Sequence, residues 1–115
     1  MTGQSALETA TAFLDAFTSK DFETASSYLA KDFVFAGPMA HFDSAEEFLA
    51  GAKSFAATIR PGWAKVAAFG DRHEALLLYD LTLASGDPWR IADHYRVTDG
   101  KIAAETILWD THGFR

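Results

Sequence analysis

The chain has 115 residues, enough for one domain with its own core and too few for two, so we expect a single domain over residues 1–115. Sixteen acidic against ten basic residues give a net charge of −6, which argues against nucleic acid or an anionic membrane surface as a partner. Cysteine is absent from the sequence, which excludes disulfides, thiolate catalysis and cysteine-ligated metals. No signal peptide precedes the first predicted helix and no apolar run approaches membrane-spanning length, so we expect a cytoplasmic protein.

Two helices are predicted in the first thirty residues. Residues 5–18 carry apolar side chains at helical spacing, and Ser5 with Glu8 forms the pattern of a capping box. Asp21 is the expected N-cap of the second helix, whose apolar stripe is Phe22, Ala25, Tyr28 and Leu29.

A short strand and a third helix follow. Residues 33–37 (FVFAG) predict the strand, which Pro38 ends, and a loop containing His41 comes next. Ser44 and Glu47 repeat the capping-box pattern at the start of the third helix, which runs through Phe55.

From residue 63 onward the pattern predicts strands, at 63–69, 74–84, 89–98 and 101–110. Asp99-Gly100 supplies the two positive φ angles of a type I′ turn between the last two. The order α-α-β-α-β-β-β-β is typical of an α+β fold in which helices cover one face of a largely antiparallel sheet.

Asp93 is the one carboxylate among the large apolar side chains on its strand face. Alternation places Trp89, Ile91, Tyr95 and Val97 on that face with it. A charge there must be paired, solvated or functional. In an apolar cavity the carboxyl group would lose hydration, its pKa would rise, and it would act as a proton donor or a base. The alternative is an ion pair with a neighbouring arginine, or hydrogen bonds from backbone donors.

The order of these elements, together with four segments, resembles a known family. The segments are residues 13–17, DFETASSYLAKDFVFAGP at 21–38, SAEEFL at 44–49 and DHYRVTDGKI at 93–102. Over residues 6–110 the chain resembles the nuclear transport factor 2-like superfamily, more narrowly its SnoaL-like branch, which includes ketosteroid isomerase and limonene epoxide hydrolase. The resemblance implies a cone, in which a strongly curved mixed sheet wraps around three N-terminal helices and leaves an apolar cavity. It also implies a homodimer formed through the outer face of the sheet.

The resemblance carries over the known chemistry only in part. Asp93 resembles the ketosteroid isomerase aspartic acid that donates a hydrogen bond to the developing oxyanion. The base of that enzyme corresponds to Gly37 here, and its helix-one tyrosine corresponds to Phe13. Steroid isomerisation by that mechanism is therefore not expected, and the Asp-Arg-Asp triad of the epoxide hydrolase has no counterpart.

His41 is the candidate that could replace the missing base, because its loop would lie at the mouth of the cavity. With Asp93 it would form an acid–base dyad; the alternative is a solvent-exposed loop histidine. The residues expected to line the pocket, each of which could instead pack in the core, are Phe13, Phe17, Tyr28, Phe33, Phe35, Trp63, Tyr79, Trp89, Ile91 and Tyr95. The histidines lack metal-ligand spacing and no phosphate-loop or dinucleotide motif is present, so we expect neither a metal nor a cofactor.

Two hypotheses of function follow. In the first, the protein binds a small apolar or aromatic molecule and works as a cofactor-independent isomerase, dehydratase or cyclase with Asp93 as its acid or base. In the second, it is a non-catalytic ligand-binding or protein-interaction module with the same fold.

Overall fold

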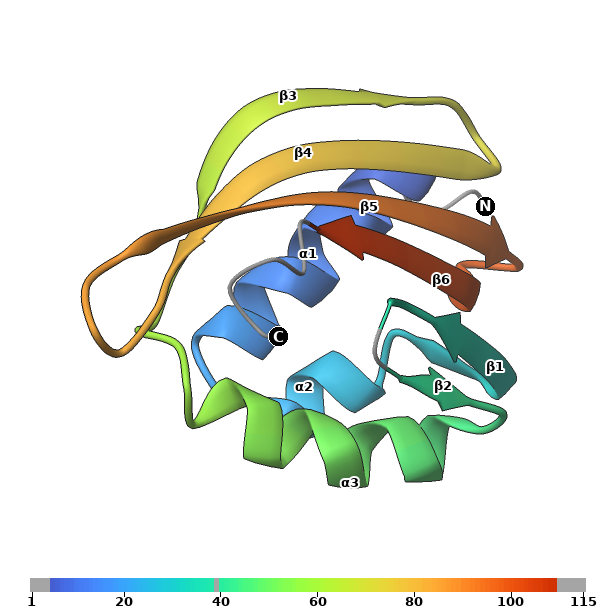
Figure 1. The fold of residues 1–115 in the computed structure, drawn as a ribbon. Coiled ribbons are helices and arrows are strands. Elements are labelled where there is room, and N and C mark those ends of the chain that lie inside the picture. Colours follow the sequence, from blue (N-terminus) through green and yellow to red (C-terminus); the bar gives the residue numbers. More distant parts are fainter. Residues whose placement is uncertain (1–4, 39, 110–115) are drawn as a thin grey trace.

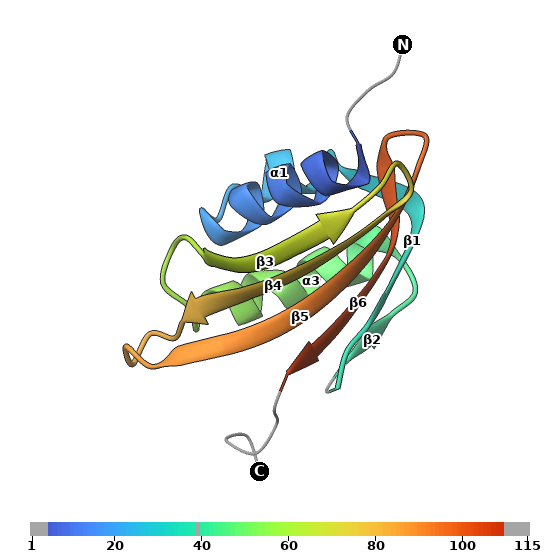
Figure 2. The ribbon, with the colours of Figure 1, turned by 90° about the horizontal axis from the view of Figure 1, so that it is seen from above.

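The computed structural model describes residues 5–38 and 40–109. Its elements are α1 (Ala6–Thr18), α2 (Phe22–Ser26), β1 (Leu29–Ala36), β2 (His41–Phe42), α3 (Ala45–Ala56), β3 (Ala64–Gly70), β4 (Glu74–Thr82), β5 (Pro88–Thr98) and β6 (Lys101–Trp109). These strands form one sheet in the order β2-β1-β6-β5-β4-β3, which is mixed because β1 runs parallel to β6. The sheet curves, and α1 and α3 lie on its concave side (Figures 1 and 2). The predicted α+β fold with a curved mixed sheet is thus confirmed. None of the helices in the described ranges is both long and apolar enough to cross a membrane.

Local side-chain chemistry starts the two longer helices. The Ser5 hydroxyl accepts from the Glu8 backbone N–H at 3.1 Å, and the Glu8 carboxylate accepts from the Ser5 N–H at 2.9 Å, which is the predicted capping box. At α3 only half of the box forms. Ser44 accepts from the Glu47 N–H at 3.1 Å, whereas the Glu47 carboxylate accepts from the Asp43 N–H, one residue earlier than predicted.

Two places in the first half of the chain differ from the prediction. The second helix ends at Ser26, and Leu29, expected on its apolar stripe, begins β1, where it pairs with Ile102 of β6. The loop expected around His41 contains the short strand β2, which is antiparallel to β1. Both differences come from pairing with distant or returning strands, and such pairing overrides local helical or loop preference.

The β5–β6 hairpin turns as predicted but contains a bulge. Asp99 and Gly100 have φ angles of 52° and 77°, as a type I′ turn requires. Beyond the turn, Val97 lies opposite Ile102 but Arg96 lies opposite Ala104, so β6 carries one extra residue at this point. A strict alternation from Ile102 would place Ala104 on the inner face. The bulge places Glu105 there instead.

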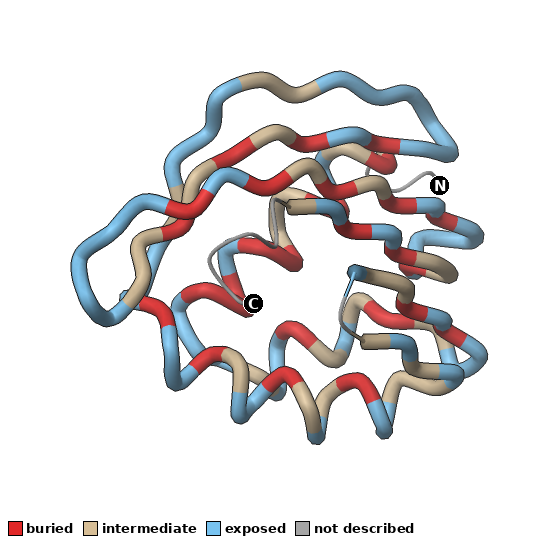
Figure 3. Tube along the Cα trace, in the orientation of Figure 1, coloured by how far each residue is buried: buried red, intermediate tan, exposed pale blue. Residues whose placement is uncertain are grey.

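Burial alternates along the central strands, as the colours of Figure 3 show, so that one face of the sheet is buried. The aromatic core is centred on Phe48 of α3, whose ring centroid lies 5.0–6.4 Å from those of Phe13, Phe17, Phe33, Phe35 and Phe42. These contacts join α1 and α3 to β1 and β2, so the helices are held against one end of the sheet. Between these rings and the remaining concave face a cavity is left open.

Candidate functional site

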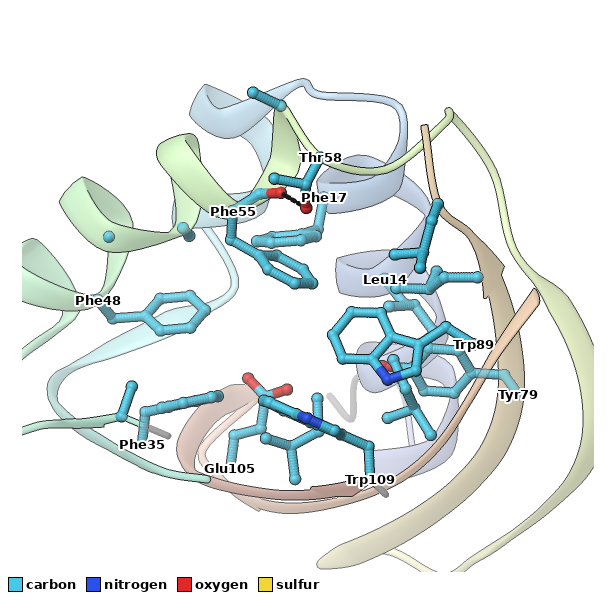
Figure 4. Close-up of a pocket in the computed structure, with 18 of the residues that line it drawn as sticks. Leu14, Phe17, Phe35, Phe48, Phe55, Thr58, Tyr79, Trp89, Glu105 and Trp109 are labelled. Atoms are coloured by element: carbon cyan, nitrogen blue, oxygen red, sulfur yellow. Dashed lines mark hydrogen bonds between the residues drawn. The ribbon is translucent and has the colours of Figure 1, made fainter. Parts of the chain in front are cut away.

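A cavity of about 750 Å³ lies between the concave face of the sheet and helices α1 and α3. Of the described residues, the aromatic ones that line it are Phe13, Phe17, Phe35, Phe42, Phe48, Phe55, Tyr79, Trp89 and Trp109. Glu105 is the one carboxyl side chain among the lining residues, and its carboxyl group points into the cavity (Figure 4). No lysine, arginine or histidine of the described chain lines this space. The wall is therefore apolar, with a single acidic group on the sheet side.

Asp93 lies behind that wall rather than in it. It is completely buried, and it is not among the lining residues. Its Oδ2 atom accepts two hydrogen bonds of 2.7 Å, one from the Tyr79 hydroxyl of β4 and one from the Tyr95 hydroxyl of its own strand. The face predicted for Asp93 is thus correct, and its partners are two phenols instead of an arginine.

Glu105 joins Asp93 to the cavity. It lies opposite Tyr95 in the β5–β6 register, on the same face as Asp93, and it is 4% exposed. The two carboxyl groups are hydrogen-bonded to each other. Because two ionised carboxylates cannot lie in contact in an apolar environment without a cation, the pair must hold a proton.

Burial is the main cause of the altered acidity of this cluster. It raises the pKa of Asp93 to about 6, although hydrogen bonds from Glu105, Tyr95 and Tyr79 act in the opposite direction. Burial, followed by the negative charge of Asp93, raises the pKa of Glu105 well above its usual range. Burial and the same charge raise the pKa values of both tyrosines, which therefore remain hydrogen-bond donors at neutral pH. The pair can accept or release a proton near neutral pH.

The structure places the ten predicted lining residues in two groups. Those that line the cavity are Phe13, Phe17, Phe35, Tyr79, Trp89 and Ile91. The other four, Tyr28, Phe33, Trp63 and Tyr95, lie elsewhere.

Each of these four has a different reason for lying outside the cavity wall. Phe33 packs edge-on against Phe48 in the core, and Tyr95 is buried with its hydroxyl on Asp93. Trp63 donates its indole N–H to Asp15 of α1 at 2.7 Å, so it covers the far side of that helix. Tyr28 is half-buried at the end of α2, where its carbonyl accepts from the Ile102 N–H.

His41 lies on β2 with an exposed side chain, and its Nε2 atom is 2.8 Å from a carboxylate oxygen of Asp43. Its neighbours Ala40 and Phe42 line the cavity, and alternation turns His41 the other way. The structure therefore gives His41 and Asp93 separate partners and does not assemble the predicted dyad. A role for His41 as a base stays a prediction.

Glu105 is the site residue that the sequence reasoning missed. The alternation of Glu105, Ile107 and Trp109 against Thr106 and Leu108 contains the signal, since the first three share one face. When the alternation is counted from the Asp99-Gly100 turn, Glu105 is placed on the outer face, because the count does not include the bulge that shifts β6 by one residue.

Comparison with known proteins identifies the family of this chain. Residues 10–105 match the SnoaL-like domain. The chain belongs to the SnoaL-like domain family. The resemblance inferred from the sequence, to the SnoaL-like branch of the nuclear transport factor 2-like superfamily, is thereby confirmed.

Solved structures agree with this assignment. A crystal structure of a protein from Kribbella flavida is 35% identical, with 97% of this SnoaL-like chain and 92% of that chain aligned at a TM-score of 0.89. An epoxide hydrolase of the limonene type from Mycobacterium tuberculosis is 18% identical (93% and 84% covered, TM-score 0.80). A putative ketosteroid isomerase from Kribbella flavida is also 18% identical (91% and 77% covered, TM-score 0.78). The last two show a shared fold alone. No curated protein sequence matches the chain.

Proposed function

We propose that this SnoaL-like domain binds a small, largely apolar molecule in its cavity and transfers a proton to or from it through the Asp93–Glu105 pair. The reaction would be a cofactor-independent isomerisation, dehydration or cyclisation. The observation that carries the proposal is the placement of one carboxyl group at the wall of an aromatic cavity, with a second buried carboxyl hydrogen-bonded behind it.

Size and acidity support this use. A volume of about 750 Å³ falls within the range of pockets that enclose small organic ligands. A general base is most effective when its pKa lies near the working pH, and burial brings the pKa of Asp93 to about 6. Asp93 does not reach the cavity, so Glu105 would exchange a proton with the substrate. The proton that the pair shares would then move between Glu105 and Asp93 behind the cavity wall.

Non-catalytic binding in the same cavity is the second candidate. It is favoured by the residues at the two positions where ketosteroid isomerase has its base and its helix-one tyrosine. Gly37 and Phe13 occupy these positions here, and neither can transfer a proton. Both candidates require ligand binding, so the experiment must separate binding from proton transfer.

Deuterium exchange separates them. With bicyclic α-hydroxyketones in D₂O, we expect the wild-type protein to accelerate exchange of the C–H next to the carbonyl. Glu105→Gln is expected to lose at least about 100-fold of that rate, because an amide cannot accept the proton. Binding should change little and can be followed by the fluorescence of Trp89 and Trp109, which line the cavity. Binding without exchange in the wild type would favour the non-catalytic module, and exchange that persists in Glu105→Gln would contradict the role of Glu105.

We further propose that the outer face of the sheet forms a homodimer interface. Phe69, Leu76 and Leu108 are 68%, 46% and 61% exposed on the strands of this face, and Phe69 lies directly opposite Leu76. Neighbouring exposed apolar side chains are typical of an interaction surface. Charged pairs lie on both sides of the apolar centre: Asp80 opposite Arg90, and Glu74 opposite Arg96. A twofold axis running between β4 and β5, parallel to them, would set each arginine against a carboxylate of the second copy.

A lysine in the centre of this face tests the dimer. Leu76→Lys would bring two like charges to an apolar contact, so we expect the dimer to dissociate to monomers at micromolar concentration in light scattering. Ala50→Lys, on the exposed side of α3, is the matched control and should stay dimeric. A wild-type protein that is already monomeric at that concentration would overturn the proposed interface.

A further inference from the structure

The hydrogen-bond donors around the carboxyl pair are all in use. Both phenols donate to Asp93 Oδ2, at 2.7 Å each. Asp93 Oδ1 and Glu105 Oε1 are the two buried carboxyl oxygens that receive no donor from the described residues. The two carboxyl groups hydrogen-bond to each other. Because Asp93 Oδ2 already accepts from both phenols, these two oxygens are the ones left to hold the shared proton.

The position of the shared proton determines whether Glu105 donates a hydrogen bond to a ligand or accepts one. The shared proton can belong to Asp93 Oδ1 or to Glu105 Oε1, and in either case the second oxygen of Glu105, Oε2, carries none. That oxygen belongs to the carboxyl group that points into the cavity (Figure 4). Glu105 therefore presents a hydrogen-bond acceptor to a ligand, not a donor.

The hydroxyl groups of the described lining residues donate elsewhere, and that of Ser85 donates to Asp87 at 3.1 Å. The Tyr79 hydroxyl is committed to Asp93, and the Thr58 hydroxyl donates to the Phe55 carbonyl at 2.7 Å. The indole nitrogens of Trp89 and Trp109 are both buried. An oxygen that can only accept, surrounded by apolar rings, costs free energy when it is left without a partner.

We propose that the ligand of this cavity is an apolar molecule with one hydroxyl or N–H group, which donates to Glu105 Oε2. The inference rests on the proposed function, since it specifies the ligand of the same cavity. A ketone, ether or ester oxygen in that place would face another acceptor. A carboxylic acid would bring a second negative charge next to the pair, where no lining residue of the described chain is cationic. Alcohols, phenols and amines are the classes that remain.

Three probes with one ring system test the inference: 2-naphthol, 2-methoxynaphthalene and 2-naphthoate, each titrated by calorimetry against the full chain at pH 7.5. We expect 2-naphthol to bind at least tenfold more tightly than either of the others. Equal binding by naphthol and its methyl ether, or tighter binding by the ether or the acid, would overturn the inference while leaving the proposed cavity in use. Failure of all three to bind would instead contradict the proposed function, and the inference with it.

Two replacements of Glu105 show whether this residue is the acceptor. In Glu105→Gln the amide N–H can donate to Asp93 Oδ1 and the amide oxygen can face the cavity, so the preference for naphthol should persist. Glu105→Leu, or Glu105→Met as a second apolar side chain of similar length, removes the acceptor, and the two neutral probes should then bind within about twofold of each other. A preference that survives both apolar replacements would overturn the assignment to Glu105.

Discussion

Asp93→Ala is expected to destabilise the protein by about 3–5 kcal/mol, the largest effect of any single change that we predict. The substitution removes the acceptor of two phenol hydrogen bonds and the carboxyl partner of Glu105. Three polar groups would then be left in a buried, apolar region from which water is excluded. Equilibrium unfolding in urea, analysed as a two-state transition, measures the loss as a lower transition midpoint at unchanged slope.

Two further variants make this result specific to the buried cluster. Tyr79→Phe removes one donor of the two and leaves the carboxyl pair intact, so a loss of about 1 kcal/mol is expected. Asp43→Ala is the control, because this exposed aspartate lies 2.8 Å from the Nε2 atom of His41 and is not among the residues of the proposed dimer interface. Such exposed pairs contribute at most about 1 kcal/mol. If Asp93→Ala cost no more than Asp43→Ala, Asp93 would not be part of a buried network.

The sequence was informative wherever local chemistry decides the structure. The Ser5–Glu8 capping box, the type I′ turn at Asp99-Gly100 and the inward face of Asp93 all depend on residues within a few positions of one another. Hydrophobic alternation therefore located the strand that carries Asp93 and identified the acid as unusual for its face.

The site itself depends on pairings that local patterns do not encode. Tyr79 reaches Asp93 from the neighbouring strand, fourteen positions earlier in the chain. Glu105 reaches the inner face only because β6 contains a bulge, which shifts the alternation that begins at the turn. His41 was placed at the mouth of the cavity by its position in the chain, but pairing of β2 with β1 turns its side chain outward. A bulge and a strand-to-strand contact are set by the register of whole strands, so neither can be read from one segment.

A shared fold does not imply shared catalytic residues. This SnoaL-like chain shares its fold with an epoxide hydrolase and a putative ketosteroid isomerase, at 18% identity to each. The positions of the base and the helix-one tyrosine of ketosteroid isomerase hold Gly37 and Phe13 here, while a glutamate on β6 has its carboxyl group at the cavity. The proton transfer that we propose for this domain therefore depends on its own Asp93–Glu105 pair and not on the residues of those enzymes.

The dependence of stability on pH is the second large effect that the pair predicts. The polar groups that contact Asp93 are those of Tyr79 on β4, Tyr95 on β5 and Glu105 on β6. Helix α1 adds only the apolar ring of Phe13, which packs against Tyr95. His94, on the outer face of the sheet, acts on Asp93 only through a weak electrostatic attraction. No lysine or arginine in the described part of the chain contacts the pair, so its pKa values stay raised.

Raised carboxyl pKa values fix the sign of the pH effect. The folded state holds protons that the unfolded chain releases near pH 4, so stability increases as the pH falls from 8 through about 6, the pKa of Asp93. The carboxyl groups whose pKa values are lowered, those of Asp21, Asp71 and Asp80, act in the opposite direction and only below about pH 4.

We expect the free energy of unfolding to be on the order of 1–2 kcal/mol larger at pH 5.5 than at pH 8, measured by urea unfolding at constant ionic strength. The overall negative charge also weakens as the pH falls, which stabilises any acidic protein, so the comparison needs a matched variant. Glu105→Gln retains the shape of the side chain and its hydrogen bond to Asp93, but it has no proton to release. Its pH dependence should be clearly smaller than that of the wild type, and the difference between the two curves is the contribution of the pair. Curves that coincide, or a wild-type protein that becomes more stable as the pH rises, would show that the two buried carboxyl groups do not share a proton in the folded state.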